Sequence, residues 1–506
     1  AVRISTLFIS MVLFTISCIE PPRDAEILWD QYGIPHIYAQ TADDLFYAYG
    51  WAQAHAHGDL LLRLYGQARG KGAEFWGEKF LDSDKWMWTN GVPARATQWA
   101  AEQVDPGRSM LESYLAGVND YAAKHPENIS ADFKVVLPIT MEDLMAHALR
   151  VLHYTFVVSP DDLQEDAKSW SDQKGSNAWA IAPVRSTSGN AMLVANPHLS
   201  WGDLFTWFEV HLNLPDANIY GASLIGSPAL GIMFNEHLGW THTVNTHDGA
   251  DLYELTLADG GYDFDGVVRP FAVDSVELFI KEGDSTRTET LVVKRSIHGP
   301  VVKEDETHAL ALRVTALDAS QIFRERWNMA LTTNLEEFES SLQDLQTPMF
   351  TVMYADKSGN IMHLFGGQTP HRPPGDYDWS GVVPGNISAS LWNDHHPYDD
   401  LPRVLNPESG WLQNANDPPW TTTFPEEIDA DDFPDYMSPR KMGFRAQRSA
   451  RMLDEDDSIS YDELVQYKFS TRMELADRLL DDLLDAASTA QDQELKNAVR
   501  VLKNWD

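Results

Sequence analysis

The chain has 506 residues, of which 38 are Lys or Arg and 76 are Asp or Glu, so its formal net charge at pH 7 is −38. This excess of negative charge is repelled by phosphate backbones and anionic membrane surfaces, which argues against a nucleic-acid-binding protein. A content of 43% hydrophobic residues with 17 tryptophans also excludes a disordered chain. We expect a packed globular protein, either of several domains or of one large intertwined domain.

The first segment is an apolar run from Ile4 to Ile19, which is too short and too rich in serine for a membrane span. We interpret residues 1–22 as an export signal, which predicts a periplasmic or extracellular bacterial protein. Cys18, the only cysteine, follows this run as in the lipidation box of bacterial lipoproteins, although Thr15 stands where leucine is usual. A lipid anchor at Cys18 and a plain cleaved signal therefore stay open as alternatives.

Residues 23–157 are expected to be mainly helical. Thr41 and Asp44 fit a capping box ahead of a long stretch with helical spacing, and residues 141–156 form another such stretch. Residues 158–175 are polar and charged without any period, so we interpret them as an exposed linker.

Strands are expected from Ser176 onward. Two runs, residues 177–183 and 191–197, flank a turn at residues 187–190, and further strand-like runs follow until helical periodicity returns near Tyr461. The last helical pattern stops at Asp506 without a capping glycine, so we expect residues 176–506 to be a C-terminally truncated unit.

The change of pattern directly after the linker predicts a processing site between Gly175 and Ser176. Cleavage there would make Ser176 an N-terminal residue. Its α-amine, with an ordinary pKa near ~8, could then act as general base for its own hydroxyl. Nucleophile and base would occupy one residue, which fits a sequence that contains no Gly-x-Ser-x-Gly elbow.

Four stretches of the sequence, in this order, resemble the penicillin acylase family of N-terminal nucleophile hydrolases: Asp30–Ala54, Gly175–Trp201, Gly239–Leu255 and Gly410–Trp420. The resemblance implies an α+β fold, a four-layer αββα sandwich formed by intertwined α and β subunits. Both subunits would come from one precursor that cuts itself before Ser176. Residues 23–157 would be the α subunit, residues 158–175 the spacer peptide and residues 176–506 the β subunit.

The resemblance also implies roles for single residues. These are Ser176 as nucleophile, His198 as the residue that orients the α-amine, and the Val244 backbone N–H with the Asn416 side-chain amide as the oxyanion hole. Two such donors aimed at a developing alkoxide contribute roughly 3 kcal/mol each. Arg448 matches a family arginine that supports the asparagine region, and Arg445 is the alternative for that place.

Calcium is a further implication of the resemblance. Asp248 and Asp251, with the backbone carbonyl of Ala250 and Asp162 from the α chain, match a calcium-binding set. Hard oxygen ligands of this kind suit Ca²⁺. The alternative is a solvated acidic loop in a chain with 76 carboxylates. No organic cofactor is expected.

The expected acyl pocket contains Leu199, Ile232 and Met233, which are aliphatic where the phenylacetyl-accepting branch of the family has phenylalanines. This favours an amidohydrolase for linear amides with aliphatic acyl chains, such as acylhomoserine lactones or lipopeptides. A β-lactam acylase for penicillins or cephalosporins is the alternative. A third hypothesis is a binding protein that keeps the fold without processing, although the intact set of site residues argues against it.

Overall fold

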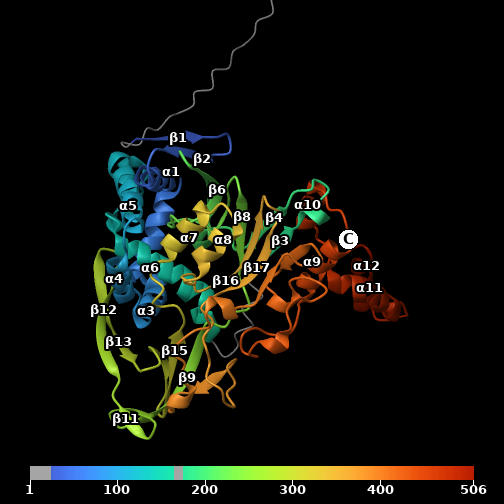
Figure 1. Ribbon diagram of the computed structural model, residues 1–506. Helices are drawn as coiled ribbons and strands as arrows, with labels where there is room; N and C mark the ends of the chain where they lie inside the picture. The colour runs from blue at the N-terminus through green and yellow to red at the C-terminus, as the bar shows by residue number, and fades with distance from the viewer. Residues whose placement is uncertain (1–23, 164–174, 490, 506) are drawn as a thin grey trace, which may run out of the picture.

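The computed structural model describes residues 24–163, 175–489 and 491–505 (Figure 1). The expected export signal at residues 1–22 with Cys18, and most of the expected linker, lie outside the described residues. No helix in the described ranges is long and apolar enough to cross a membrane.

Two stacked sheets form the centre of the molecule. In the described part of the chain, nine strands make the larger sheet, in the order β1 (Ala25–Trp29), β2 (Pro35–Ala39), β5 (Trp207–Leu214), β6 (Ala217–Leu224), β7 (Ile232–Phe234), β8 (Leu238–Thr243), β16 (Met349–Asp356), β17 (Ile361–Gly367) and β19 (Arg403–Leu405). The smaller sheet has the order β20 (Trp411–Asn414), β3 (Gly175–Ile181) and β4 (Met192–His198).

Strand β16 shows why the two sheets stack, because its side chains alternate between two apolar environments. Val352 and Tyr354 belong to the main core, and the Tyr354 ring lies 4.7 Å from that of Phe338 on helix α8 (Leu335–Leu342). Met353 and Ala355 point the other way and pack with alanines of β3. All eight residues of β16 are buried, so this strand lies between a helical layer and the smaller sheet.

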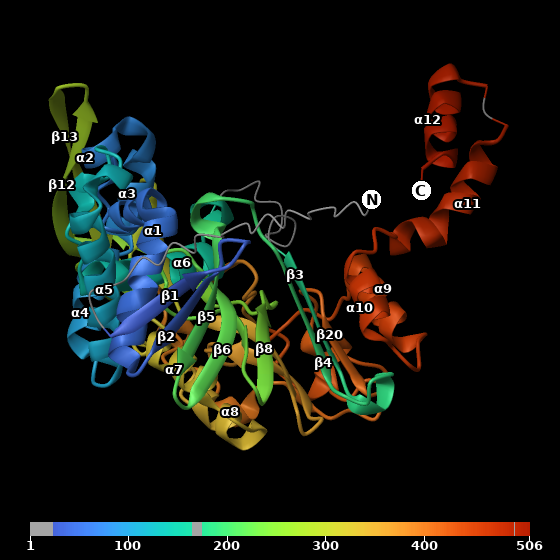
Figure 2. The same cartoon turned by 90° about the horizontal axis from the view of Figure 1, so that it is seen from above.

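Helices cover both outer faces (Figure 2). On the side of the larger sheet lie α1 (Ala42–Ala68), α4 (Val92–Glu102), α5 (Gly107–Lys124), α6 (Met141–Val151) and α7 (Ile322–Leu331) with α8. On the side of the smaller sheet, α9 (Phe444–Asp454) packs onto β3 and β20, and Trp179 Nε1 donates to Ser449 Oγ at 2.6 Å. The expected four-layer αββα sandwich is therefore confirmed.

The helix expectations are confirmed in part. Helix α1 begins at Ala42 behind its Thr41 cap, whose side chain accepts from the Asp44 N–H, which is one half of the expected capping box; the Asp44 carboxylate accepts from the Thr41 hydroxyl. Helix α10 (Tyr461–Lys468) begins at Tyr461, followed by α11 (Glu474–Ala487) and α12 (Gln493–Lys503). The sequence analysis missed α7, α8 and α9, which are short and lie between strands.

Helices α1 and α5 cross at very close range because glycine occupies both contact points. A Cβ at Gly50 would lie 2.0 Å from the Tyr114 carbonyl oxygen, and a Cβ at Gly117 would lie 2.0 Å from that of Tyr47. Any side chain at either position would push the helices apart. This tight pair holds the helical layer rigidly against the sheet.

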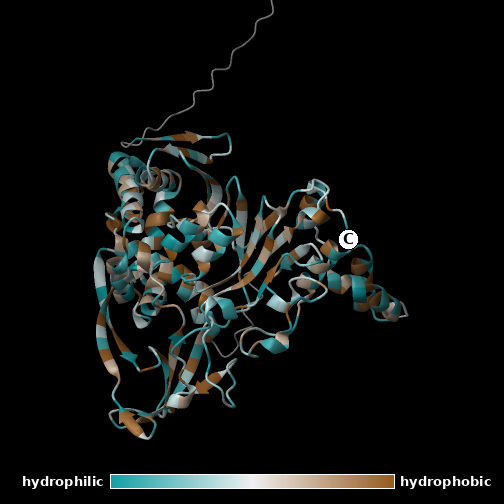
Figure 3. Cartoon of the chain, viewed as in Figure 1, coloured by the Kyte–Doolittle hydropathy of each residue, from teal (hydrophilic) through white to brown (hydrophobic). Residues whose placement is uncertain are grey.

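A second β region extends away from the sandwich. One sheet has the order β11 (Val267–Arg269), β10 (Gly261–Phe264), β9 (Ala250–Ala258), β15 (His308–Val314) and β14 (Val301–Glu304), with β18 (Val382–Pro384) parallel to β9. A long hairpin, β12 (Ala272–Glu282) and β13 (Ser285–Arg295), packs through Leu278 and Ile280 on α2 (Gly72–Trp76) and α3 (Leu81–Thr89). Hydrophobic and hydrophilic residues are mixed along these outer strands (Figure 3).

His363 gives the fold a pH dependence that can be tested. It lies on β17 opposite Met353, is fully buried, and neither ring nitrogen has a hydrogen-bond partner among the described residues. Burial lowers the pKa of His363 to about 3. Because the pKa of His363 is lower in the folded protein than in the unfolded chain, the free energy of unfolding is highest above pH ~6.5. It falls by about 1.4 kcal/mol per pH unit from there towards pH 3.

We expect the His363→Leu variant to lose less unfolding free energy than the wild type between pH 7 and pH 4, because the replaced group no longer takes up a proton on unfolding. Urea unfolding at a series of pH values measures this slope. The same substitution at His371, whose side chain is 60% exposed, is the matched control. An unchanged slope in His363→Leu would contradict the assignment.

Candidate active site

Pairing with β20 sets the position of Ser176, the second residue of β3. The two strands are antiparallel with Asn414 opposite Ala178, and extending this register by two residues places Asn416 opposite Ser176. Strand β4 flanks the other side of β3, with His198 opposite Gly175. Residues more than 200 positions apart in the sequence, Ser176 and Asn416, thus meet at the end of the smaller sheet.

Ser176 is 4% exposed, and both its N–H and its hydroxyl donate hydrogen bonds. Its backbone N–H donates to Asn416 Oδ1 at 2.6 Å, and its hydroxyl donates to the Gly175 carbonyl oxygen at 2.8 Å. The hydroxyl therefore lies beside the carbonyl of the bond at which processing is expected.

Asn416 presents both ends of its amide to the site. Its backbone has φ +61°, in the left-handed region that asparagine tolerates better than most residues. Its Nδ2 donates to the Val244 carbonyl oxygen at 2.6 Å, directly after the end of β8. The second Nδ2 hydrogen has no acceptor among the described residues, which leaves a donor for a substrate oxygen.

Asp417 fixes the loop that carries Asn416, although the sequence analysis did not single it out. Its carboxylate accepts from the Ala415 N–H at 2.7 Å and from Gln413 Nε2 at 2.7 Å. Asp417 is 3% exposed, and burial raises the pKa of its carboxyl. A buried carboxylate with several donors is a rigid support for the neighbouring asparagine.

His198 lies beside the expected cleavage point. A methyl group at Gly175 would lie 3.6 Å from His198 Nδ1 and 3.2 Å from Asn416 Oδ1, so the two side chains converge on that residue. Burial lowers the pKa of His198, and the charges of Arg445 and Lys468 lower it further. At neutral pH the ring is uncharged and can accept or donate one hydrogen bond.

The arginine that contacts the asparagine is Arg445, which corrects the expectation of Arg448. Arg445 Nη2 donates to Asn416 Oδ1 at 2.6 Å and Nη1 donates to the Ser176 carbonyl oxygen at 2.7 Å. Arg448 is one turn further along α9, and its nearest ionic partner is Asp477 at 3.8 Å. Three residues advance the chain by about 4.5 Å along the helix axis and leave the two side chains roughly 60° apart, which is enough to give them different partners.

Ser176 opens into a cavity of about 130 Å³ between the larger sheet and helices α6 and α7. Leu199 and Ile232 line this cavity, as does Val244. Met233 does not line it, because the side chains of β7 alternate and Met233 is buried on the opposite face. The pocket expectation is therefore wrong for Met233.

The cavity also has an aromatic lining, which the sequence analysis missed. The rings belong to Phe156, Trp207, Phe323 and Phe350. They come from the segment after α6, from β5, from α7 and from β16, so no single stretch of sequence reveals them. The aliphatic residues that we expected make up only part of the wall.

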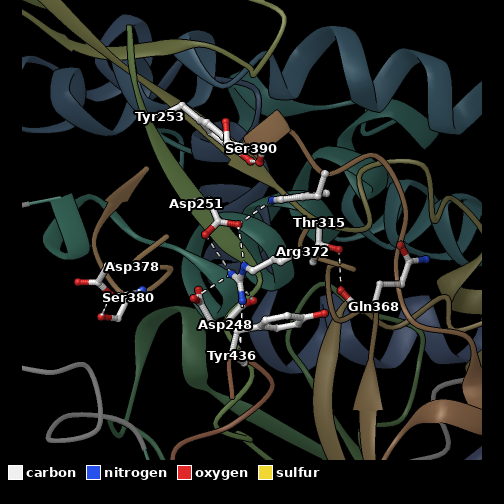
Figure 4. Close-up of polar contacts among 11 residues, drawn as sticks. Asp248, Asp251, Tyr253, Thr315, Gln368, Arg372, Asp378, Ser380, Ser390 and Tyr436 are labelled. Carbon is white, nitrogen blue, oxygen red and sulfur yellow. Dashed lines mark hydrogen bonds and ion pairs between the residues drawn. The ribbon is translucent and has the colours of Figure 1, made fainter. Parts of the chain in front are cut away.

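Two of the expected calcium ligands, Asp248 and Asp251, contact an arginine (Figure 4). Arg372 Nη2 lies 2.8 Å from Asp248 Oδ2 and 3.0 Å from Asp251 Oδ1, and its Nε donates to Asp251 Oδ2 at 3.1 Å. The side chains of Arg372 and Asp251 are fully buried. Burial raises the pKa of Asp251, and the charge of Arg372 opposes this shift.

This arrangement does not fit Ca²⁺. The guanidinium lies between the two carboxylates, balances one of their two charges and would repel a second cation at the same place. Asp162 accepts from the N–H and hydroxyl of Ser159, and Ala250 is the first residue of β9, paired with Val314 of β15. In the described ranges, no group of three or more His, Cys, Asp or Glu side chains could hold a metal ion. Asp248 and Asp251, which were expected to bind calcium, instead form an ion pair with the buried Arg372.

Known proteins resemble this chain along most of its length. Acyl-homoserine lactone acylase PvdQ from Pseudomonas fluorescens (strain Pf0-1) is 25% identical over 558 residues, covering 95% of this chain and 70% of that protein. Acyl-homoserine lactone acylase QuiP from the same strain is 22% identical, covering 76% of this chain and 55% of that protein.

A solved structure supports the fold. The thermostable penicillin G acylase from Alcaligenes faecalis superposes with a TM-score of 0.55 at 22% sequence identity. The match covers 65% of this chain and 59% of that chain, so this chain spans less than two thirds of the solved acylase. The penicillin amidase family model matches residues 24–506, which is nearly the whole chain. The chain belongs to the penicillin amidase family, a family of amidohydrolases.

Proposed function

We propose that the protein is a self-processing acylase that hydrolyses the amide bond of N-acyl compounds with Ser176 as an N-terminal nucleophile. The observation that supports this most is the double contact of Ser176: its hydroxyl bonds to the Gly175 carbonyl and its N–H bonds to Asn416. The same residue also lines the cavity. The proposal includes export, with residues 1–22 removed as a signal.

Maturation is the first reaction of this proposal. The Ser176 oxygen attacks the Gly175 carbonyl carbon, the C–N bond breaks, and the nitrogen takes up the hydroxyl proton to become an α-amine. Water then hydrolyses the Gly175 ester, which frees the hydroxyl. The neutral His198 ring and Asn416 Oδ1 hold the new amine beside that hydroxyl.

Amide hydrolysis repeats these steps on a substrate. Ser176 attacks the substrate carbonyl while its α-amine takes the proton, and the developing alkoxide accepts hydrogen bonds from the Val244 N–H and from Asn416 Nδ2. The α-ammonium protonates the leaving amine, and water hydrolyses the acyl ester. Arg445 acts as a positioning residue because it holds Asn416 Oδ1.

For the substrate, we propose N-acyl amides with hydrocarbon-rich acyl chains, of which acylhomoserine lactones and lipopeptides are examples. The similarity to proteins named acyl-homoserine lactone acylases and the apolar wall of the cavity both favour this class. The aromatic rings of Phe156 and Phe350 favour a second candidate, a β-lactam acylase for acyl groups that carry a phenyl ring.

The two candidates differ in their response to acyl length. We expect kcat/KM to rise from butanoyl to longer chains, because each buried methylene contributes about 0.8 kcal/mol until the cavity is full. Hydrolysis of an N-acyl ladder from butanoyl to dodecanoyl, with phenylacetyl amide as comparison, measures this. A clear preference for phenylacetyl would select the β-lactam acylase. A purified protein that stays uncut and hydrolyses none of them would support the binding protein.

A further inference from the structure

The two donors of the proposed oxyanion hole belong to different sheets. Val244 directly follows β8 of the larger sheet, and Asn416 lies two residues beyond the end of β20 in the smaller sheet. Donors stabilise a developing alkoxide only when they are held in the right geometry before the reaction. The distance between these two strand ends must therefore be fixed by contacts that join them.

Asn414, the last residue of β20, makes such a contact. Its side-chain carbonyl oxygen accepts from the Thr243 hydroxyl at 2.5 Å and from the Asn416 N–H at 3.0 Å. Thr243 is the last residue of β8 and directly precedes Val244. One oxygen atom, Asn414 Oδ1, thus bonds both to the strand that presents Val244 and to the backbone of Asn416.

The orientation of the Asn414 amide follows from its partners. The Asn416 N–H can only donate, so the atom that faces it must be the amide oxygen. At the other end of the amide, Nδ2 donates to the Asp417 carbonyl oxygen at 3.1 Å, which can only accept. The position therefore requires an acceptor and a donor on one short side chain, which asparagine provides.

Burial strengthens the connection between the two sheets. Asn414 is fully buried and Thr243 is 1% exposed, so water does not compete for their hydrogen bond. Asn416 Nδ2 also donates to the Val244 carbonyl oxygen at 2.6 Å. Two hydrogen bonds between the same strand ends fix their relative rotation, which a single hydrogen bond would leave free.

We propose that Asn414 is a positioning residue of the oxyanion hole and that Thr243 acts through it. Their hydrogen bond sets the separation of the Val244 N–H and Asn416 Nδ2 before negative charge develops on the substrate oxygen. Neither Asn414 nor Thr243 is among the described residues that line the acyl cavity, so the contribution belongs to the reaction rate and not to substrate binding. This inference rests on the proposed acylase function, which it makes more specific.

The Thr243→Val variant tests the connection without changing the size of the side chain. It removes the hydroxyl that donates to Asn414, and we expect kcat to fall about tenfold while KM stays within about twofold. Thr243→Ser keeps the hydroxyl and is expected to retain most of the wild-type kcat. Asn414→Leu removes both contacts of Oδ1 and is expected to lower kcat about 100-fold, as the loss of one oxyanion donor does.

Thr351→Val is the matched control. Thr351 lies directly opposite Thr243 on β16, is fully buried, and its hydroxyl has no hydrogen-bond partner among the described residues. Loss of this hydroxyl is expected to leave kcat and KM unchanged. Steady-state kinetics with an N-acyl amide measures all four variants, and a contribution to substrate binding would appear in KM.

The outcomes are distinguishable. A Thr243→Val variant with wild-type kcat, a loss confined to KM, or an equal loss in Thr351→Val would overturn the inference and leave the acylase function in place. If the wild type hydrolyses no amide, the proposed function fails, and crystal structures of the two valine variants decide whether Asn414 positions Asn416. An Asn416 amide displaced from Val244 in Thr243→Val alone would support the inference, and an unmoved amide would overturn it.

Discussion

Replacing Ser176 with alanine is expected to leave one uncut polypeptide and to abolish amide hydrolysis. The hydroxyl that contacts the Gly175 carbonyl is the nucleophile for both reactions of the proposal, and its removal leaves no substitute at that place. Loss of a catalytic serine typically lowers kcat by about a millionfold. Denaturing gel electrophoresis of the purified precursor, followed by an assay with N-acyl amides, measures both effects.

The conservative variant and a control make this test specific. Ser176→Cys keeps a nucleophile at the same position and should still be cut, at a changed rate, since a thiol can also attack a carbonyl. Ser186→Ala, at the far end of the same hairpin and bonded to Ser188, should be processed like the wild type. Cleavage after Gly175 in the Ser176→Ala variant would show that another group cuts the chain.

The Arg372→Met variant is expected to lose about 3–5 kcal/mol of unfolding free energy, because removing one partner of a buried ion pair leaves the other charge uncompensated. Among the described residues, the fully buried carboxylate of Asp251 would then keep only the hydrogen bond from Trp392 Nε1 at 2.7 Å. Chemical unfolding at pH 7 measures the loss. Arg440→Met, which removes an exposed arginine paired with Asp431 and Asp435, is the control and should have no measurable effect.

The effect of Ca²⁺ on the melting temperature is a second measurement on the Arg372→Met variant. We expect the melting temperature of the wild type to be the same in Ca²⁺ and in EGTA, since the guanidinium lies between the carboxylates and repels the cation. The Arg372→Met protein, with Asp248 and Asp251 free to bind a cation, is expected to melt at a higher temperature in millimolar Ca²⁺. A wild-type protein that EGTA destabilises would contradict the ion-pair assignment.

The sequence predicted those features of the fold that are encoded locally. The turn at residues 187–190 joins β3 to β4, and the strand-like run at residues 191–197 is β4, because turn formers and alternating apolar residues act over a few positions. Ser176 was predicted from the change of pattern after the linker, and Asn416 from the resemblance of its short motif to the penicillin acylase family. Helices α7 and α8 were missed, since short helices between strands leave little periodicity.

Contacts between distant segments account for the rest of what the sequence did not reveal. Arg372 lies more than 100 positions from its two carboxylates, so nothing in the acidic motif indicates that a guanidinium neutralises it. The choice between Arg445 and Arg448 depends on the rotation of α9 relative to β3. A sequence pattern shows neither which side of a helix faces a site nor which distant residues meet in the folded protein.

The parallel pairing of β2 with β5 has a consequence for the proposed mature protein. These strands come from opposite sides of the proposed cut, and β1 extends the same sheet beyond β2. The two polypeptides would therefore share one hydrogen-bonded ladder, which neither can complete alone. In the uncut precursor the connecting chain keeps the two segments close together. After the cut, two separated polypeptides would meet only by diffusion in solution. Once denatured, the severed protein would be expected to recover poorly on dilution, whereas the intact precursor would regain its structure.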